Sequence, residues 1–80
     1  MNYWVFIFLL LLPAYSFGQV QMQKLKEKAQ SGNAIAQYEL GSEYLFGDNV
    51  EEDDQQAFYW LNKSAQQGVP SALHLLQVLS

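Results

Sequence analysis

His74 is the single histidine of this 80-residue chain, and an enzyme could use it as a general base. A hydrolytic mechanism would need His74 to lie at hydrogen-bond distance from a nucleophile such as Ser71 or Ser42. Nothing in the spacing of these residues requires that contact, and catalysis needs several converging groups. We therefore interpret His74 as a partly exposed helical histidine and predict no catalytic residue. A hydrolase is the weakest of the hypotheses considered.

The acidic stretch over residues 48–54 is the second candidate for chemistry, because carboxylates are ligands for Ca²⁺. The stretch lacks the glycine and the spaced terminal glutamate of an EF-hand loop. Its acids would lie favourably at the N-terminus of a helix. The chain has no cysteine, and one histidine cannot form a zinc-type cluster. We predict a solvated loop, with no metal site and no bound cofactor.

Lys24, Lys26 and Lys28 form a small basic cluster in a chain whose net charge is −4. On a helix these lysines spread over a wide arc, which favours a solvated face over a membrane-binding patch. The acidic balance argues against nucleic acid as a partner. The sequence contains neither a P-loop nor a dinucleotide-binding fingerprint. These residues predict neither a nucleotide-binding nor a nucleic-acid-binding function.

Residues 1–18 carry no charged side chain, in contrast to the rest of the chain. An apolar run over residues 3–12 is followed by Pro13 and a short stretch rich in small residues, which is the layout of a signal peptide without its usual initial lysine or arginine. Ser16 and Gly18 are spaced as a signal peptidase requires, so we predict cleavage after Gly18, or alternatively after Ser16. The other alternative is an uncleaved membrane anchor, although Pro13 interrupts a run that would need about 20 apolar residues to span. We expect an exported product, periplasmic or secreted if the source is bacterial, that meets a membrane only if the leader is retained.

Four helices are predicted in the mature chain, over residues 19–30, 34–46, 54–67 and from Pro70 to Leu79. Asn33 and Asp53 can cap the second and third of them, because their side chains accept hydrogen bonds from free backbone N–H groups. Gly32, Gly47 and Gly68 are placed to end the first three. Helices of this length joined by short loops pack as antiparallel neighbours.

The mature chain also repeats itself at an offset of 36 residues. The identities at this offset include Leu25 with Leu61, Ala29 with Ala65, Gln30 with Gln66, Gly32 with Gly68, Ala36 with Ala72 and Leu40 with Leu76. Self-similarity at a period of about 20 to 50 residues is typical of solenoid proteins. Trp60 is expected in the core of this stack, whereas its neighbours Phe58 and Tyr59 turn onto other faces and are expected to be partly exposed.

One part of the chain resembles a known family. Residues 36–47 read AQYELGSEYLFG and are followed by Val50, Asp53, Ala57, Trp60, Lys63, Ala65 and Gly68. This ordered pattern resembles the Sel-one-like repeat (SLR), a relative of the tetratricopeptide α/α solenoids. The resemblance implies an all-α fold of α/α hairpins, with one full repeat over about residues 33–68 between two half repeats. The repeat-defining positions are Ala36, Leu40, Gly41, Tyr44, Gly47, Ala57, Trp60, Leu61, Ala65 and Gly68.

The same resemblance implies a scaffold for protein–protein contacts. A cysteine-rich exported branch of the family has been linked to penicillin binding and β-lactamase activity, but this chain has no cysteine and that activity is not carried over. We predict that Tyr38, Ser42 and Leu45, on the expected concave side of the second helix, contact the partner. The apolar C-terminal helix lacks a polar outer face and is predicted to add a self-association surface. A truncated copy of a longer repeat array, without independent function, is the alternative.

Overall fold

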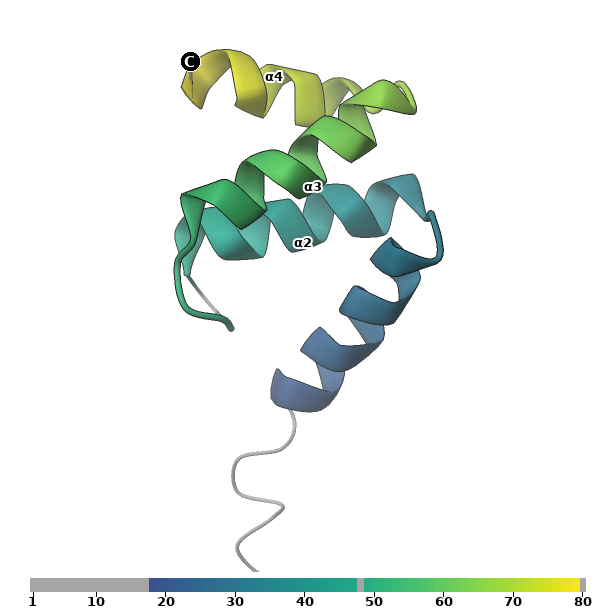
Figure 1. The fold of residues 1–80 in the computed structure, drawn as a ribbon, viewed down its shortest axis with the longest axis vertical. Coiled ribbons are helices and arrows are strands. Elements are labelled where there is room, and N and C mark those ends of the chain that lie inside the picture. The colour runs from purple at the N-terminus through teal and green to yellow at the C-terminus, as the bar shows by residue number, and fades with distance from the viewer. Residues whose placement is uncertain (1–17, 48, 80) are drawn as a thin grey trace, which may run out of the picture.

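The computed structural model describes residues 18–47 and 49–79, and its regular structure is entirely helical (Figure 1). The elements are a helix over residues 18–30, then α2 (Ala34–Phe46), α3 (Asp54–Gln66) and α4 (Pro70–Leu79). The described chain therefore confirms the predicted all-α solenoid of the tetratricopeptide type. No helix in these two ranges is long and apolar enough to cross a membrane. The predicted leader lies outside the described residues apart from Gly18, which is already helical.

Local hydrogen bonds explain where α2 begins and ends. The Asn33 side chain accepts a hydrogen bond from the N–H of Ala36 at 2.8 Å, which caps the first turn. At the other end Gly47 adopts the left-handed conformation with φ of 68°, and its N–H donates to the Glu43 carbonyl at 2.8 Å. Both boundaries are those predicted from the sequence.

The ends of α3 follow the same rules with one small difference. Asp53 caps the helix by accepting from the N–H of Gln56 at 3.2 Å. The helix ends at Gln66 and not at Gln67, because Gln67 already leaves the helical conformation before Gly68 reverses the chain with φ of 90°. Pro70 then opens α4, where its missing N–H costs nothing.

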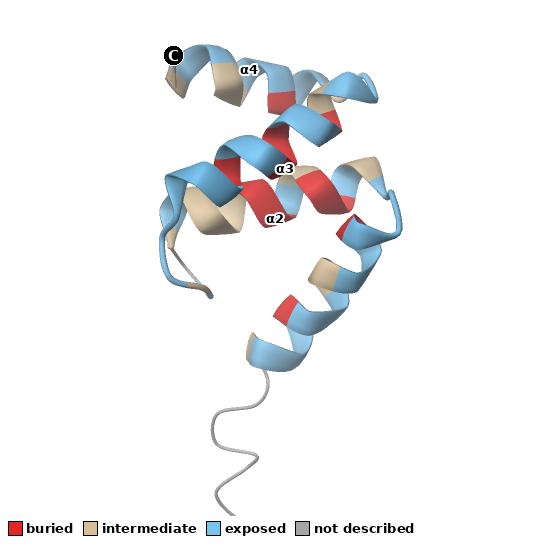
Figure 2. Cartoon of the chain, in the orientation of Figure 1, coloured by how far each residue is buried: buried red, intermediate tan, exposed pale blue. Residues whose placement is uncertain are grey.

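The main apolar cluster joins three of the four helices. Its buried members are Met22, Ala29, Ala36, Leu40 and Trp60. They lie on the inward stripes of helix 18–30, α2 and α3, as the burial colouring in Figure 2 makes visible. This cluster fixes helix 18–30 against the hairpin formed by α2 and α3.

A second buried contact holds α2 directly against α3. Gly41 of α2 faces Leu61 and the carbonyl of Ala57, and all three residues are buried. Beside them the fully buried Ser64 donates its hydroxyl hydrogen to the carbonyl of Ala34 at 2.7 Å. The absence of a side chain at Gly41 is what lets the two helices approach this closely.

A polar network closes the end of the stack near the first loop. Gln37 is only 4% exposed, and its side-chain amide donates to the carbonyl of Ala29 at 3.1 Å. Gln67 in turn donates to the Gln37 side-chain oxygen at 2.9 Å and to the carbonyl of Gly32 at 3.0 Å. Among the described residues no buried side-chain nitrogen or oxygen lacks a hydrogen-bond partner, so the network orients helix 18–30 without leaving such an atom unsatisfied.

The three consecutive aromatic residues of α3 differ in their exposure, as predicted. Trp60 is 9% exposed, whereas Phe58 is 37% and Tyr59 52% exposed. The rings of Tyr59 and Trp60 meet edge to face at 4.9 Å between centroids. The 100° turn between neighbouring helical residues is the reason, since only one of three consecutive side chains can point into a narrow interface.

Candidate functional site

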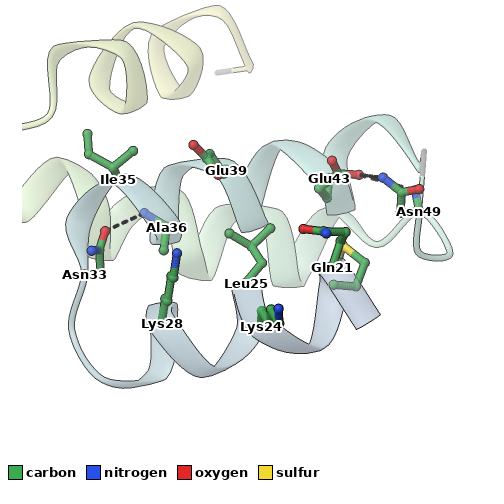
Figure 3. Close-up of a pocket in the computed structure, with 11 residues that line it drawn as sticks. Gln21, Lys24, Leu25, Lys28, Asn33, Ile35, Ala36, Glu39, Glu43 and Asn49 are labelled. Carbon is green, nitrogen blue, oxygen red and sulfur yellow. Dashed lines mark hydrogen bonds between the residues drawn. The ribbon is translucent and has the colours of Figure 1, made fainter. Parts of the chain in front are cut away.

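A groove of about 470 Å³ runs between helix 18–30 and α2 (Figure 3). Its floor is apolar, because Met22 and Ala36 lie beneath it and are 5% and 4% exposed. Leu25 is half-buried and continues this floor. Met22 and Ala36 are already covered within the main apolar cluster, so the apolar surface open to a ligand is that of Leu25 and of Ile35, which also lines the groove and is 55% exposed.

The two walls of the groove carry opposite charges. Lys24 and Lys28 are four residues apart on helix 18–30 and so lie on one side of it, as Figure 3 shows. Glu39 and Glu43 have the same spacing on α2 and face the groove from the other side. A ligand in the groove would meet positive charge along one edge and negative charge along the other.

The end of the groove is shaped by a contact between α2 and the loop that follows it. The Glu43 carboxylate accepts hydrogen bonds from the backbone N–H of Asn49 at 3.3 Å and from its side-chain amide at 3.2 Å. Asn33, at the opposite end, is occupied as the cap of α2. The groove is thus closed at both ends by asparagine residues that also hold the fold.

In the described ranges no hydrogen bond joins His74 to Ser71 or Ser42, the residues considered for catalysis. His74 and Ser71 are exposed on α4, and Ser42 donates its hydroxyl hydrogen within α2 to the Tyr38 carbonyl at 3.0 Å. Across residues 18–47 and 49–79 no group of three or more histidine, cysteine or acidic side chains could hold a metal ion. The described part of the acidic stretch leads into the N-terminus of α3, where Asp53 serves as the cap.

Comparison with known proteins decides the family, because residues 34–69 match the model of the Sel1 repeat. These residues form a Sel1 repeat. The match spans α2, α3 and the turn into α4, so the family recognised from the sequence is confirmed. Sel1 repeats are protein–protein interaction modules, and the family is generally non-catalytic.

Three relatives contain similar repeats. Over 53 residues the chain is 43% identical to the secretory immunoglobulin A-binding protein EsiB of Escherichia coli O6:H1, an alignment that covers 66% of this chain and 10% of EsiB. It is 37% identical over 65 residues to the sel1-like repeat-containing protein R850 of Acanthamoeba polyphaga mimivirus, covering 79% of this chain and 13% of that protein. It is 38% identical over 55 residues to HRD3A of Arabidopsis thaliana, an ERAD-associated E3 ubiquitin-protein ligase component, covering 68% and 8%.

The chain spans about a tenth of the length of the curated relatives that it matches. No solved structure matches it. The relatives therefore identify the repeat unit, and their own ligands and assemblies belong to much longer proteins.

The predicted partner-binding residues lie beside the groove of this Sel1 repeat and do not line it. Tyr38, Ser42 and Leu45 are each half-buried on the neighbouring stripe of α2. The stripe that faces the groove holds Ile35 and the two glutamates of the wall instead. Sequence reasoning missed this stripe, although the offset of 36 residues aligns helix 18–30 with α3 and so relates their contact faces.

The repeat-defining residues occupy three levels of burial. Six are buried, namely Ala36, Leu40, Gly41, Ala57, Trp60 and Leu61. Tyr44, Gly47 and Ala65 are half-buried, and Gly68 is exposed in the turn between α3 and α4. The buried six form the contacts of α2 with its neighbours described above.

The last helix of the chain contributes little to the core. Ala72 is its one buried residue, whereas Leu73 is 52% and Val78 66% exposed. An exposed apolar helix is what the sequence predicted for this end of the solenoid. Self-association through α4 stays a prediction.

Proposed function

We propose that this protein is an exported interaction module that binds another protein through the groove between helix 18–30 and α2. The observation that carries the proposal is the groove's apolar floor between two walls of opposite charge, one of which, α2, belongs to the Sel1 repeat. Burial of Leu25 and Ile35 supplies affinity, and complementary charge selects the partner. Tyr38, Ser42 and Leu45 extend the contact surface beyond the α2 edge of the groove in this proposal.

Charge reversal of one wall tests the proposal. The protein recovered from a host that expresses the full 80-residue sequence is immobilised as wild type and as Lys24→Glu/Lys28→Glu, and the retained proteins are identified and quantified. We expect the groove variant to retain its principal partner at least about tenfold less, because like charges across an interface are strongly disfavoured.

The matched control is Lys26→Glu/Lys63→Glu, which changes the net charge equally at two lysines that do not line the groove. It should retain the partner as the wild type does. Far-ultraviolet circular dichroism checks that both variants keep their helices. Equal retention by the groove variant and the wild type would place the binding surface elsewhere and contradict the proposal.

Export rests on the composition of the leader and on one relative. Residues 1–18 have the layout of a signal peptide. One relative, EsiB, is named as a secretory immunoglobulin A-binding protein. Both observations support an exported product, periplasmic or secreted.

The mature N-terminus tests the export part. Intact-mass measurement of the protein from the periplasm or medium of a bacterial host is expected to give a chain that begins at Gln19. Gly18→Leu should move the cut to the position after Ser16, because a signal peptidase needs small residues there. Recovery of the uncut chain in the membrane fraction would instead support the anchor.

A further inference from the structure

Helix 18–30 and α3 are the same element of two successive repeats. Helix 18–30 ends 36 residues before Gln66, the last residue of α3. Leu25 and Ala29 are identical to Leu61 and Ala65 at that offset. The surroundings of α3 therefore predict what helix 18–30 would contact in a complete array.

The face of α3 that corresponds to the groove wall on helix 18–30 is covered by α2. Ala57 and Leu61 lie against Gly41 of α2, and Ser64 donates a hydrogen bond to the α2 carbonyl at Ala34. Counting back 36 residues from these α3 positions gives Gln21, Leu25 and Lys28. All three line the groove. The groove is therefore the place of the helix that would precede helix 18–30 in a longer solenoid.

The chemistry of this place differs from that of the α2–α3 contact. Ala57 and Ser64 are replaced by Gln21 and Lys28, so a helix that presented an uncharged contact face, as α2 presents Gly41 to α3, would bury a lysine there without a counter-charge. On the other wall of the groove, the same helix would also bury Glu39 without a counter-charge. Among residues 18–47 and 49–79, neither lysine of the wall nor Glu39 has a charged partner.

We propose that the groove binds an α-helix of a partner protein that carries acidic residues on one flank, basic residues on the other and an apolar stripe between them. This inference rests on the proposed function and names the partner's chemistry. The acidic flank faces Lys24 and Lys28, the basic flank faces Glu39 and Glu43, and the stripe covers the floor. The helix takes the position on helix 18–30 that α2 takes on α3.

A second copy of this chain is a poorer occupant. Its exposed apolar helix is α4, with the sequence PSALHLLQVL, which contains no acidic or basic residue apart from His74. Such a helix would leave the four wall charges unpaired at the moment they lose water. A helix with charge on both flanks satisfies them, and recognition of an amphipathic helix in a groove is a common mode of peptide binding.

Three fluorescent helical peptides of 13 residues, the length of α2, test the inference. They share one apolar stripe in an alanine-rich background; the flanks are acidic and basic in the first, both acidic in the second and both basic in the third. Binding to the protein recovered from a host expressing the full sequence is followed by fluorescence anisotropy. The wild type is expected to bind the first peptide at least about tenfold more tightly than the other two, and less tightly as salt is added.

Variants of the two walls should exchange this preference. Lys24→Glu/Lys28→Glu makes both walls acidic and should prefer the peptide with two basic flanks. Glu39→Lys/Glu43→Lys should prefer the peptide with two acidic flanks, and Glu39→Lys alone, which keeps the Glu43 contact to Asn49, should shift in the same direction. The control Glu51→Lys/Glu52→Lys changes the net charge equally outside the groove and should keep the wild-type order.

Three results would contradict the proposed helix-binding groove. The inference is overturned if all proteins rank the peptides alike, if none binds, or if sedimentation reveals a dimer that the lysine reversals dissociate. Partner capture separates it from the proposed function. A partner that the wild type retains and the groove variant loses, with no peptide bound, leaves the module in place and rejects the helix as its ligand.

Discussion

Replacing Leu61 by alanine is expected to lower the free energy of unfolding by about 3 kcal/mol. Leu61 has no exposed surface and lies in the close contact of α3 with Gly41 on α2. Truncation removes buried apolar atoms and leaves a cavity between two helices whose approach is fixed by backbone contacts on either side. A core of this size rarely supplies more than about 3–5 kcal/mol, so the variant should be largely unfolded at room temperature.

Urea unfolding followed by circular dichroism at the helix band measures this effect. Leu73→Ala is the matched control, because it deletes the same atoms from a residue that is 52% exposed on α4. Its expected change is within about 0.5 kcal/mol. Equal losses for both variants would mean that α2 and α3 are not packed as described. A cooperative wild-type transition is also what separates an independent module from a truncated array without its own fold.

Gly41→Val is expected to destabilise the protein by about 2–3 kcal/mol, although glycine is a poor helix former. A β-carbon at this position would lie 2.8 Å from Cγ of Leu61 and 3.1 Å from the carbonyl oxygen of Ala57. The first atom is close to the α3 backbone and the second belongs to it, so neither can move without separating the helices. Gly41→Ala should show a smaller loss, because better helix propensity offsets part of the clash by about 1 kcal/mol.

A double-mutant cycle tests whether this loss of stability arises from the contact between Gly41 and Leu61. In the Leu61→Ala background the nearest obstacle is gone, so adding alanine at Gly41 should cost less than it does in the wild type. The same urea titrations give all four free energies, provided a stabilising osmolyte keeps the Leu61→Ala protein folded at zero urea. Strict additivity would indicate that the penalty arises within α2 and not from its contact with α3.

The helices and their ends were predictable because their causes are local. Asn33 and Asp53 cap α2 and α3 through side chains that reach N–H groups three residues ahead. Gly47 ends α2 by adopting a conformation that other residues rarely take. The prediction for α3 was one residue too long, because the sequence does not reveal at which residue of the turn before Gly68 the helical hydrogen bonds cease.

The division of the aromatic residues was equally predictable, since helical periodicity allows only one member of the Phe58–Trp60 run to face the core. The roles of Gln37 and Ser64 were not. Each bonds to the backbone of a neighbouring helix, and nothing in the flanking sequence distinguishes them from solvent-exposed polar residues. Their partners depend on how the helices cross.

The sequence by itself determined that this is an all-α chain with a Sel1 repeat. The composition of its leader predicted export, and the family resemblance predicted a binding module. Periodicity, caps and the offset of 36 residues carry that information along the chain. Only the tertiary structure showed the groove at which we propose that a partner binds. Lys24 and Lys28 face Glu39 and Glu43 because the cluster around Met22 and Ala36 and the Gln37 network fix the angle of helix 18–30 against α2. Such an angle is set by contacts between separate helices, which the spacing of residues within one helix does not encode.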